Sequence, residues 1–247
     1  MPTPLDITFA VFFAAVVAGL EAVFFDKRFK REVASGAPDV RRRWYRRAMI
    51  GQWVLAGVAI ALWAHSGRSW TALGLVPPTG WRLGVGIASS VAVVGFAIMQ
   101  ILAVRRMNAE RRAQLRPRLS NVEFVLPHTV TEYRWFVLLS ITAGVCEELL
   151  YRGFLTWLLG AFLGLPAAIA LVATGFGLAH AYQGGRGVIK TSAVSLVMSL
   201  IVVASGWLIP AMLVHALVDI TSGVLGFSVY REQQRPAPPV TAVMQLS

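Results

Sequence analysis

The chain has 247 residues, of which 56% are hydrophobic and 14% are charged, and its formal net charge is +11. An average soluble domain carries about 25% charged residues, so the composition excludes an ordinary soluble domain and indicates an integral membrane protein. The basic residues do not indicate nucleic-acid binding either. Nine of the 23 lie between Lys27 and Arg47 and six more between Arg105 and Arg118, directly beside apolar segments. Such clusters are typical of cytoplasmic loops that meet anionic lipid headgroups.

Seven apolar segments approach or exceed the roughly 20 residues that a helix needs to cross a bilayer. The fourth is too long for one upright crossing, and we expect it to tilt, to protrude or to break near Gly160. The sequence therefore predicts an all-α transmembrane bundle of about seven helices, or eight if the fourth span is two helices. The predicted spans cover roughly residues 6–25, 49–65, 82–104, 133–163, 166–182, 188–205 and 207–228.

The loop charges predict the orientation of the bundle. The loops after the first and third spans carry the two basic clusters and should be cytoplasmic, which places the N-terminus outside and the C-terminus inside. We divide the chain into three N-terminal helices with basic loops (1–132), a core of four helices (133–228) and a C-terminal tail (229–247). The first apolar run has no basic segment before it, so we expect a retained helix and not a cleaved signal peptide.

Ionisable residues inside the last four spans are the main functional signal. A charged side chain at the centre of a bilayer costs roughly 2.5–3.5 kcal/mol on insertion scales, so it persists only when it is paired, neutralised or facing a wet cavity. An ionisable cluster at this depth is therefore a candidate functional site. Its members are Glu147, Glu148 and Arg152 on the fourth span, His180 near the end of the fifth, and His215 and Asp219 on the seventh.

The spacing of these residues predicts their contacts. Glu148 and Arg152 are four residues apart, share a helix face and should form an ion pair. Glu147 lies about 100° around the helix from Glu148, which makes it the carboxylate available as a general base. Asp219 is four residues after His215 and is expected to hold its imidazole by a hydrogen bond.

These residue types fit two kinds of chemistry. A buried carboxylate with two imidazoles can polarise a water and stabilise an oxyanion, which are the needs of peptide hydrolysis. Glu147, His180 and His215 could instead bind Zn²⁺ as a His₂Glu site. The sequence has no His-Glu-x-x-His helix, so we favour a site without metal or other cofactor.

A structural interpretation stands beside each functional one. Histidines in membrane helices commonly serve packing through a hydrogen bond, and Glu148–Arg152 could be only a structural pair. Cys146, beside Glu147, is expected to be a small packing residue and not a nucleophile.

Three motifs follow one another along the chain, on the fourth, fifth and seventh spans: Glu147-Glu148 with Arg152, Phe176 with His180, and His215 with Asp219. Together they resemble the CPBP family of intramembrane proteases, which comprises CAAX proteases and bacteriocin-processing (Abi) proteins. The resemblance covers roughly residues 133–228 and implies a glutamate-type endopeptidase without metal, in a bacterial plasma membrane. Glu147 would then activate water, while His180 and His215 assist and stabilise the oxyanion. Asp219 stands where the eukaryotic prenyl-protein proteases carry Asn.

Two alternative functions remain open at this point. A membrane immunity or scaffold protein could use the same fold without catalysis. An ion-coupled transporter could use the buried carboxylates and histidines as a relay, although no paired inverted repeats are visible. The expected partners are anionic lipid headgroups at the basic loops and a membrane-bound peptide or protein substrate, with no nucleic acid.

Overall fold

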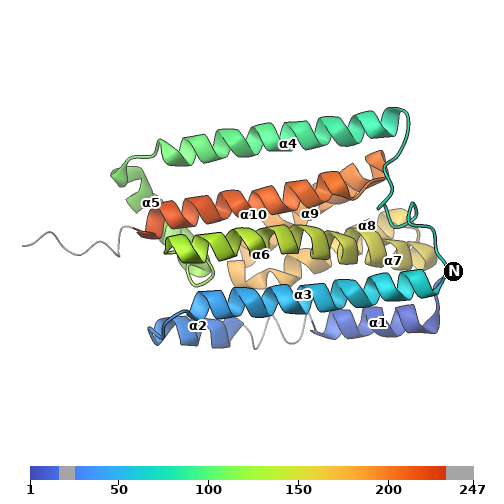
Figure 1. Cartoon of the computed structure of the whole chain (residues 1–247), viewed down its shortest axis with the longest axis horizontal. Coiled ribbons are helices and arrows are strands. Elements are labelled where there is room, and N and C mark those ends of the chain that lie inside the picture. Colours follow the sequence, from blue (N-terminus) through green and yellow to red (C-terminus); the bar gives the residue numbers. More distant parts are fainter. Residues whose placement is uncertain (17–25, 232–247) are drawn as a thin grey trace, which may run out of the picture.

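The computed structural model describes residues 1–16 and 26–231, and within those ranges it is helical with no β-strand (Figure 1). The predicted all-α class is confirmed. The helices are α1 (Pro4–Ala15), α2 (Asp26–Ala34), α3 (Val40–His65), α4 (Trp81–Arg105), α5 (Ala109–Leu119), α6 (Val130–Glu148), α7 (Thr156–Leu163), α8 (Leu165–Ala179), α9 (Gly185–Ser205) and α10 (Ile209–Tyr230). A π-helical turn, Leu149–Leu155, joins α6 to α7, and a 3₁₀ turn, Ala181–Gln183, follows α8.

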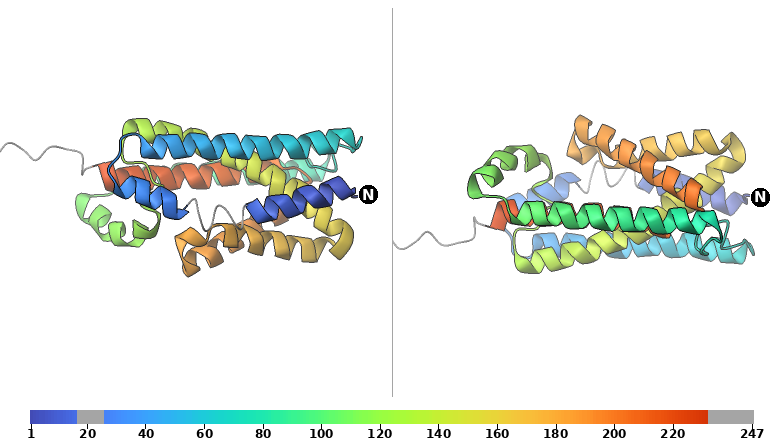
Figure 2. Two further views of the ribbon diagram at one scale, coloured as in Figure 1. Left: turned by 90° about the horizontal axis from the view of Figure 1, so that it is seen from below. Right: turned by 90° about the horizontal axis from the view of Figure 1, so that it is seen from above.

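The long helices run side by side along one axis, with α3 beside α6 and α4 beside α10 (Figures 1 and 2). Four of the described helices, α3, α4, α9 and α10, are long and apolar enough to cross a membrane, and α1 and α8 are shorter apolar helices. The basic helices α2 and α5 lie at the end of the bundle opposite the N-terminus (Figure 1). The protein is therefore an integral membrane bundle with its basic clusters gathered at one end.

Helix boundaries differ from the predicted spans where polar residues continue a helix. α3 begins at Val40, because the basic residues that follow keep helical geometry before the apolar part starts. α10 continues to Tyr230, just inside the predicted tail. Residues 17–25 of the first predicted span and 232–247 of the tail lie outside the described residues.

The fourth predicted span is a continuous helical segment whose regularity changes at the π-helical turn and not at Gly160. Gly153 in this turn packs closely on the α3–α4 loop and the start of α10, since a Cβ there would lie 3.1 Å from Leu73 and 3.3 Å from Leu208. Gly160 has open space around its Cα. π-helical turns are rare and occur frequently at functional sites, and this one begins directly after Glu148.

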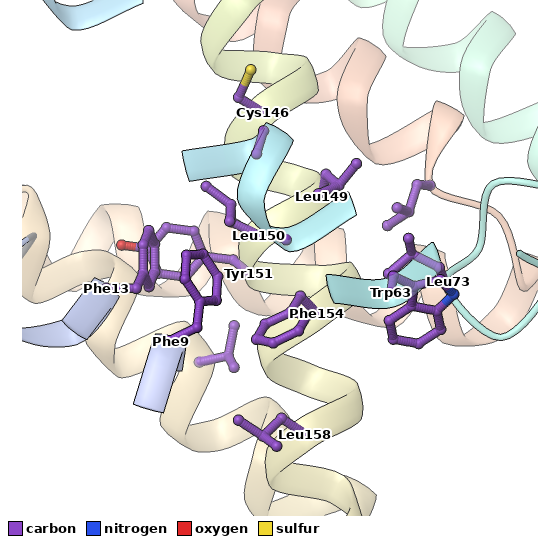
Figure 3. Close-up of a cluster of buried hydrophobic side chains, with 14 of the residues drawn as sticks. Phe9, Phe13, Trp63, Leu73, Cys146, Leu149, Leu150, Tyr151, Phe154 and Leu158 are labelled. Atoms are coloured by element: carbon purple, nitrogen blue, oxygen red, sulfur yellow. The ribbon is translucent and has the colours of Figure 1, made fainter. Parts of the chain in front are cut away.

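An aromatic core holds α1, α3, the π-helical turn and α8 together (Figure 3). Trp63, Tyr151 and Phe154 are almost fully buried in it. Edge-to-face contacts join Phe9 to Phe154 and Tyr151 to Phe176, with ring centroids 5.3 and 4.9 Å apart. Such pairs stabilise beyond the area that they bury. This core lies directly beside the ionisable residues and gives them a rigid frame.

Candidate active site

Glu148 is the centre of the ionisable cluster and is fully buried. Its Oε1 accepts hydrogen bonds from Arg152 Nη1 and from His215 Nδ1, each at 2.8 Å. The predicted Glu148–Arg152 ion pair is therefore present. Arg152 also donates to the hydroxyl of Ser195 on α9 and stacks on Phe176, with its guanidinium carbon 4.3 Å from the ring centroid. The pair links α6, α8, α9 and α10.

The contacts of His215 fix its orientation and tautomer. Because an ionised carboxylate only accepts hydrogen bonds, Nδ1 carries a proton, and Nε2 is the atom directed toward Asp219 and Glu147. Nε2 lies 3.7 Å from Asp219 Oδ2 and 3.9 Å from Glu147 Oε2, both beyond hydrogen-bond length. Asp219 lies within ion-pair distance but does not form the predicted hydrogen bond to the imidazole. Glu148 holds it, because the close packing of α6 on α10 brings the carboxylate to Nδ1.

Glycine allows that close packing. A Cβ at Gly144 of α6 would lie 2.8 Å from the carbonyl oxygen of Met212 and 2.9 Å from the Cβ of Ala216 on α10. No side chain fits there, so the two helix backbones approach closely one turn before Glu148. This contact sets the distance between Glu148 and His215.

Glu147 faces a different neighbour. Its side chain is 18% exposed, and its Oε1 accepts a hydrogen bond from Gln52 Nε2 of α3 at 2.7 Å. Gln52 was missed in the sequence, although an amide inside the apolar span 49–65 is the signal that could have indicated it. The two oxygens of Glu147 thus face different groups, Oε1 toward Gln52 and Oε2 toward His215.

His180 stands at the C-terminus of α8 and joins the cluster through Phe176. Its Nδ1 donates to the carbonyl oxygen of Phe176 at 2.8 Å, which leaves Nε2 as the acceptor atom of a neutral ring. The Phe176 ring centroid lies 4.6 Å from that of His180 and 5.6 Å from that of His215. Among the described residues, His180 makes no hydrogen bond to Glu147 or His215. The Phe176 ring contacts both imidazoles.

The alternative Zn²⁺ ligands, Glu147, His180 and His215, come from α6, the C-terminus of α8 and α10. Within residues 1–16 and 26–231, no group of three His, Cys, Asp or Glu side chains is arranged to hold a metal ion. Glu147, His180 and His215 therefore do not form a ligand set in this arrangement of side chains.

Fold and site together define an integral membrane protein with a buried acid–base cluster at the junction of α6, α8 and α10. Residues 129–221 match the family model of the Type II CAAX prenyl endopeptidase Rce1-like proteins. The match begins at the N-cap of α6, ends within α10 and confirms the predicted resemblance to the CPBP family over this segment. The family supports a protease activity in the membrane. No curated protein and no solved structure matches the chain.

Proposed function

We propose that the protein is an intramembrane endopeptidase in which Glu147 is the general base. The observation that carries the proposal is the pair Glu147 Oε2 and His215 Nε2, which face each other 3.9 Å apart within the matched segment. This distance is too long for a direct hydrogen bond but suits two groups that act on one small reactant between them. Few membrane proteins keep a carboxylate in an apolar bundle without a function for it.

The proposed hydrolysis starts with a water molecule that enters between Glu147 and His215. Glu147 accepts one proton from the water, and the oxygen of that water bonds to the carbonyl carbon of the scissile peptide. The C–N bond then breaks, and Glu147 passes the proton to the leaving amine nitrogen. The products are a carboxylic acid and an amine, and the Glu147 carboxylate is regenerated.

The histidines stabilise the oxyanion of the tetrahedral intermediate in this proposal. His215, when protonated on both ring nitrogens, donates from Nε2 toward the developing negative charge. His180, across Phe176 at the C-terminus of α8, already donates from Nδ1 to the Phe176 carbonyl oxygen, so it can donate to the oxyanion only when its Nε2 is protonated as well. Glu148 and Arg152 are positioning residues, because they hold the His215 ring and the surrounding helices.

We propose a membrane-associated peptide as substrate, with a prenylated CAAX C-terminus as the first class to test. The description of the matched family names prenyl endopeptidases, which motivates this choice. Because the site lies among apolar membrane helices, it favours a substrate peptide that is already anchored in the bilayer.

The test uses purified protein in lipid vesicles with a fluorescence-quenched farnesylated CAAX peptide. Wild-type protein should cleave it, and Glu147→Gln, which keeps the size of the side chain, should lose at least about 10³-fold in kcat/KM. His180→Ala and His215→Ala should also lose activity while remaining monodisperse. Equal cleavage by Glu147→Gln would overturn the assignment of the base.

The same vesicles separate the remaining alternatives. Loss of cleavage with a chelator and its return with Zn²⁺ would replace the metal-free mechanism by a zinc mechanism. A pH-gradient-dependent transport signal without cleavage would favour a transporter. A biological role that survives Glu147→Gln would favour a scaffold or immunity protein.

We also propose that the basic end of the bundle binds anionic lipid headgroups. α5 has no buried residue and carries Arg111, Arg112, Arg116 and Arg118. α2 packs Phe29 on Trp44 and Phe124, with ring centroids 5.1 and 5.2 Å apart. Its basic residues Lys27, Arg28 and Arg31 are exposed. Headgroups near these helices would neutralise the charge that the loops concentrate.

A further inference from the structure

Gln52 lies on α3, outside the segment that matches the family model, yet it faces the candidate active site. It belongs to one stripe of the helix with Ala56, Ala59 and Trp63, spaced four, three and four residues apart. The two alanines are 1% exposed and Trp63 is fully buried, so this stripe is the packed face of α3. Small side chains on it let α3 approach α6, and α3 lies beside α6 in the bundle (Figure 1).

The orientation of the Gln52 amide is set by Glu147. Its Nε2 donates to Glu147 Oε1 at 2.7 Å, a length typical of a charge-assisted hydrogen bond. The reverse orientation would place the amide oxygen against a carboxylate oxygen, and two acceptors repel each other. The contact therefore requires a donor at this position and an acceptor at Glu147.

The other end of the amide shows that packing alone does not explain Gln52. Its Oε1 is buried and has no hydrogen-bond partner among the described residues. A buried acceptor without a partner is costly, and a methionine or leucine of similar volume would avoid that cost. The buried Oε1 of Gln52 makes the fold less stable, so we explain the presence of glutamine here by the hydrogen bond that its Nε2 donates to Glu147.

We infer that Gln52 is a positioning residue for the general base. By binding Oε1 it fixes the Glu147 carboxylate in the rotamer that turns Oε2 toward His215 Nε2. In the proposed mechanism Oε2, which faces His215, accepts the proton of the attacking water. The inference rests on the proposed function of Glu147 and adds a residue from the N-terminal helices to the site.

The test compares Gln52→Met with the matched control Gln100→Met on the exposed face of α4. Methionine keeps the chain length and removes the donor. In protein labelled with ¹³C at the glutamate carboxyl carbon, the resonance absent from Glu147→Gln identifies Glu147. Gln52→Met should shift this resonance and Gln100→Met should leave it in place. An unchanged resonance in Gln52→Met overturns the inference, whatever the activity of the protein.

Kinetics on the farnesylated peptide in vesicles provide the second readout. Loss of a hydrogen bond to a charged group predicts a fall in kcat of about 10- to 100-fold, with KM within about twofold and no lower melting temperature. A kcat of Gln52→Met within twofold of wild type would contradict the inference. A fall in kcat that is accompanied by a lower melting temperature would contradict it too. Neither result would affect the proposed function. Cleavage by Glu147→Gln at the wild-type rate would instead overturn the proposed function.

Discussion

At the scale of single residues, the cluster divides its carboxylates between two tasks. Glu148 is fully buried and gives one oxygen to both Arg152 and His215, whereas Glu147 is partly exposed and keeps an oxygen directed at His215 Nε2. A buried ion pair adds little net stability compared with apolar residues, but removal of one partner is strongly destabilising. In the proposed mechanism the pair fixes the position of His215, and Glu147 acts as the general base.

Arg152→Met tests the buried pair. It leaves Glu148 buried without its cation, which costs about 3–5 kcal/mol, so the melting temperature in detergent should fall by roughly 10 °C. The control is Arg28→Met, which removes the cation of Arg28–Glu32, another pair at i, i+4 but with an arginine side chain that is 65% exposed. Exposed pairs contribute little, so the control should melt like wild type. Equal melting temperatures for both variants would contradict the structural role of Arg152.

His128, in the loop before α6, gives a prediction on pH. Burial and the nearby Arg41 guanidinium, which donates to its Nε2, lower the pKa of His128 to about 4. The unfolded chain binds this proton below about pH 6.5 and the folded protein only near pH 4, so folding weakens as pH falls between these values. His128→Gln should flatten the decline of the melting temperature from pH 6.5 to 4.5. A slope as steep as that of wild type would rule out this histidine as a source of acid sensitivity.

At the scale of helices, close backbone packing places the site residues. α6 meets α10 at Gly144, the π-helical turn after Glu148 carries Arg152 toward Ser195 of α9, and α8 ends at His180. The site therefore depends on the exact spacing of helices as much as on its ionisable groups.

Gly144→Ala should push α6 away from α10 and break the hydrogen bond from His215 to Glu148. We expect roughly a 100-fold loss of kcat, because displacements of about 1 Å have effects of this size. Gly160→Ala in α7 is the control, since no atom lies within 4 Å of the added Cβ. It should be active and equally or more stable, as alanine favours helix over glycine. An active Gly144→Ala variant would show that the Glu148–His215 contact is not needed.

The sequence predicts the apolar helices and the Glu148–Arg152 pair, because apolar length and i, i+4 spacing are local properties. It does not predict the helices α2 and α5, which fall in segments predicted to be basic loops. Nor does it predict the hydrogen bond from His215 to Glu148, since that contact depends on how closely α6 packs on α10. The Gln52–Glu147 hydrogen bond is missed for the same reason, because its residues are 95 positions apart in the chain. The π-helical turn is also missed. Gly153 in this turn packs on Leu73 and Leu208, which are distant in the chain, so local sequence patterns do not indicate it.

At the scale of the whole molecule, charge separates the two ends of the bundle. The basic clusters lie together around α2 and α5, and the N-terminus and the α3–α4 loop lie at the other end (Figure 1). This separation supports the predicted orientation with the N-terminus outside, because basic loops stay on the cytoplasmic side.

Cysteine labelling in intact cells tests the orientation. Cys146 is fully buried, and Cys146→Ser provides a background in which Thr79→Cys and Ala37→Cys, both at exposed positions, report the two ends. A membrane-impermeant maleimide should label Thr79→Cys in intact cells and Ala37→Cys only after permeabilisation. The reverse labelling pattern would show that the bundle has the opposite orientation in the membrane. The background variant should keep its activity, since Cys146 has no role in the proposed chemistry.

We propose that this membrane bundle hydrolyses a peptide bond through Glu147. The most direct measurement compares the membrane proteomes of cells that express wild-type protein, Glu147→Gln or the surface control Glu110→Gln, with new C-termini identified by mass spectrometry. At least one fragment should be present with wild type and Glu110→Gln, and absent with Glu147→Gln, where its uncleaved precursor should accumulate. The same fragments in equal amounts with Glu147→Gln would contradict the account.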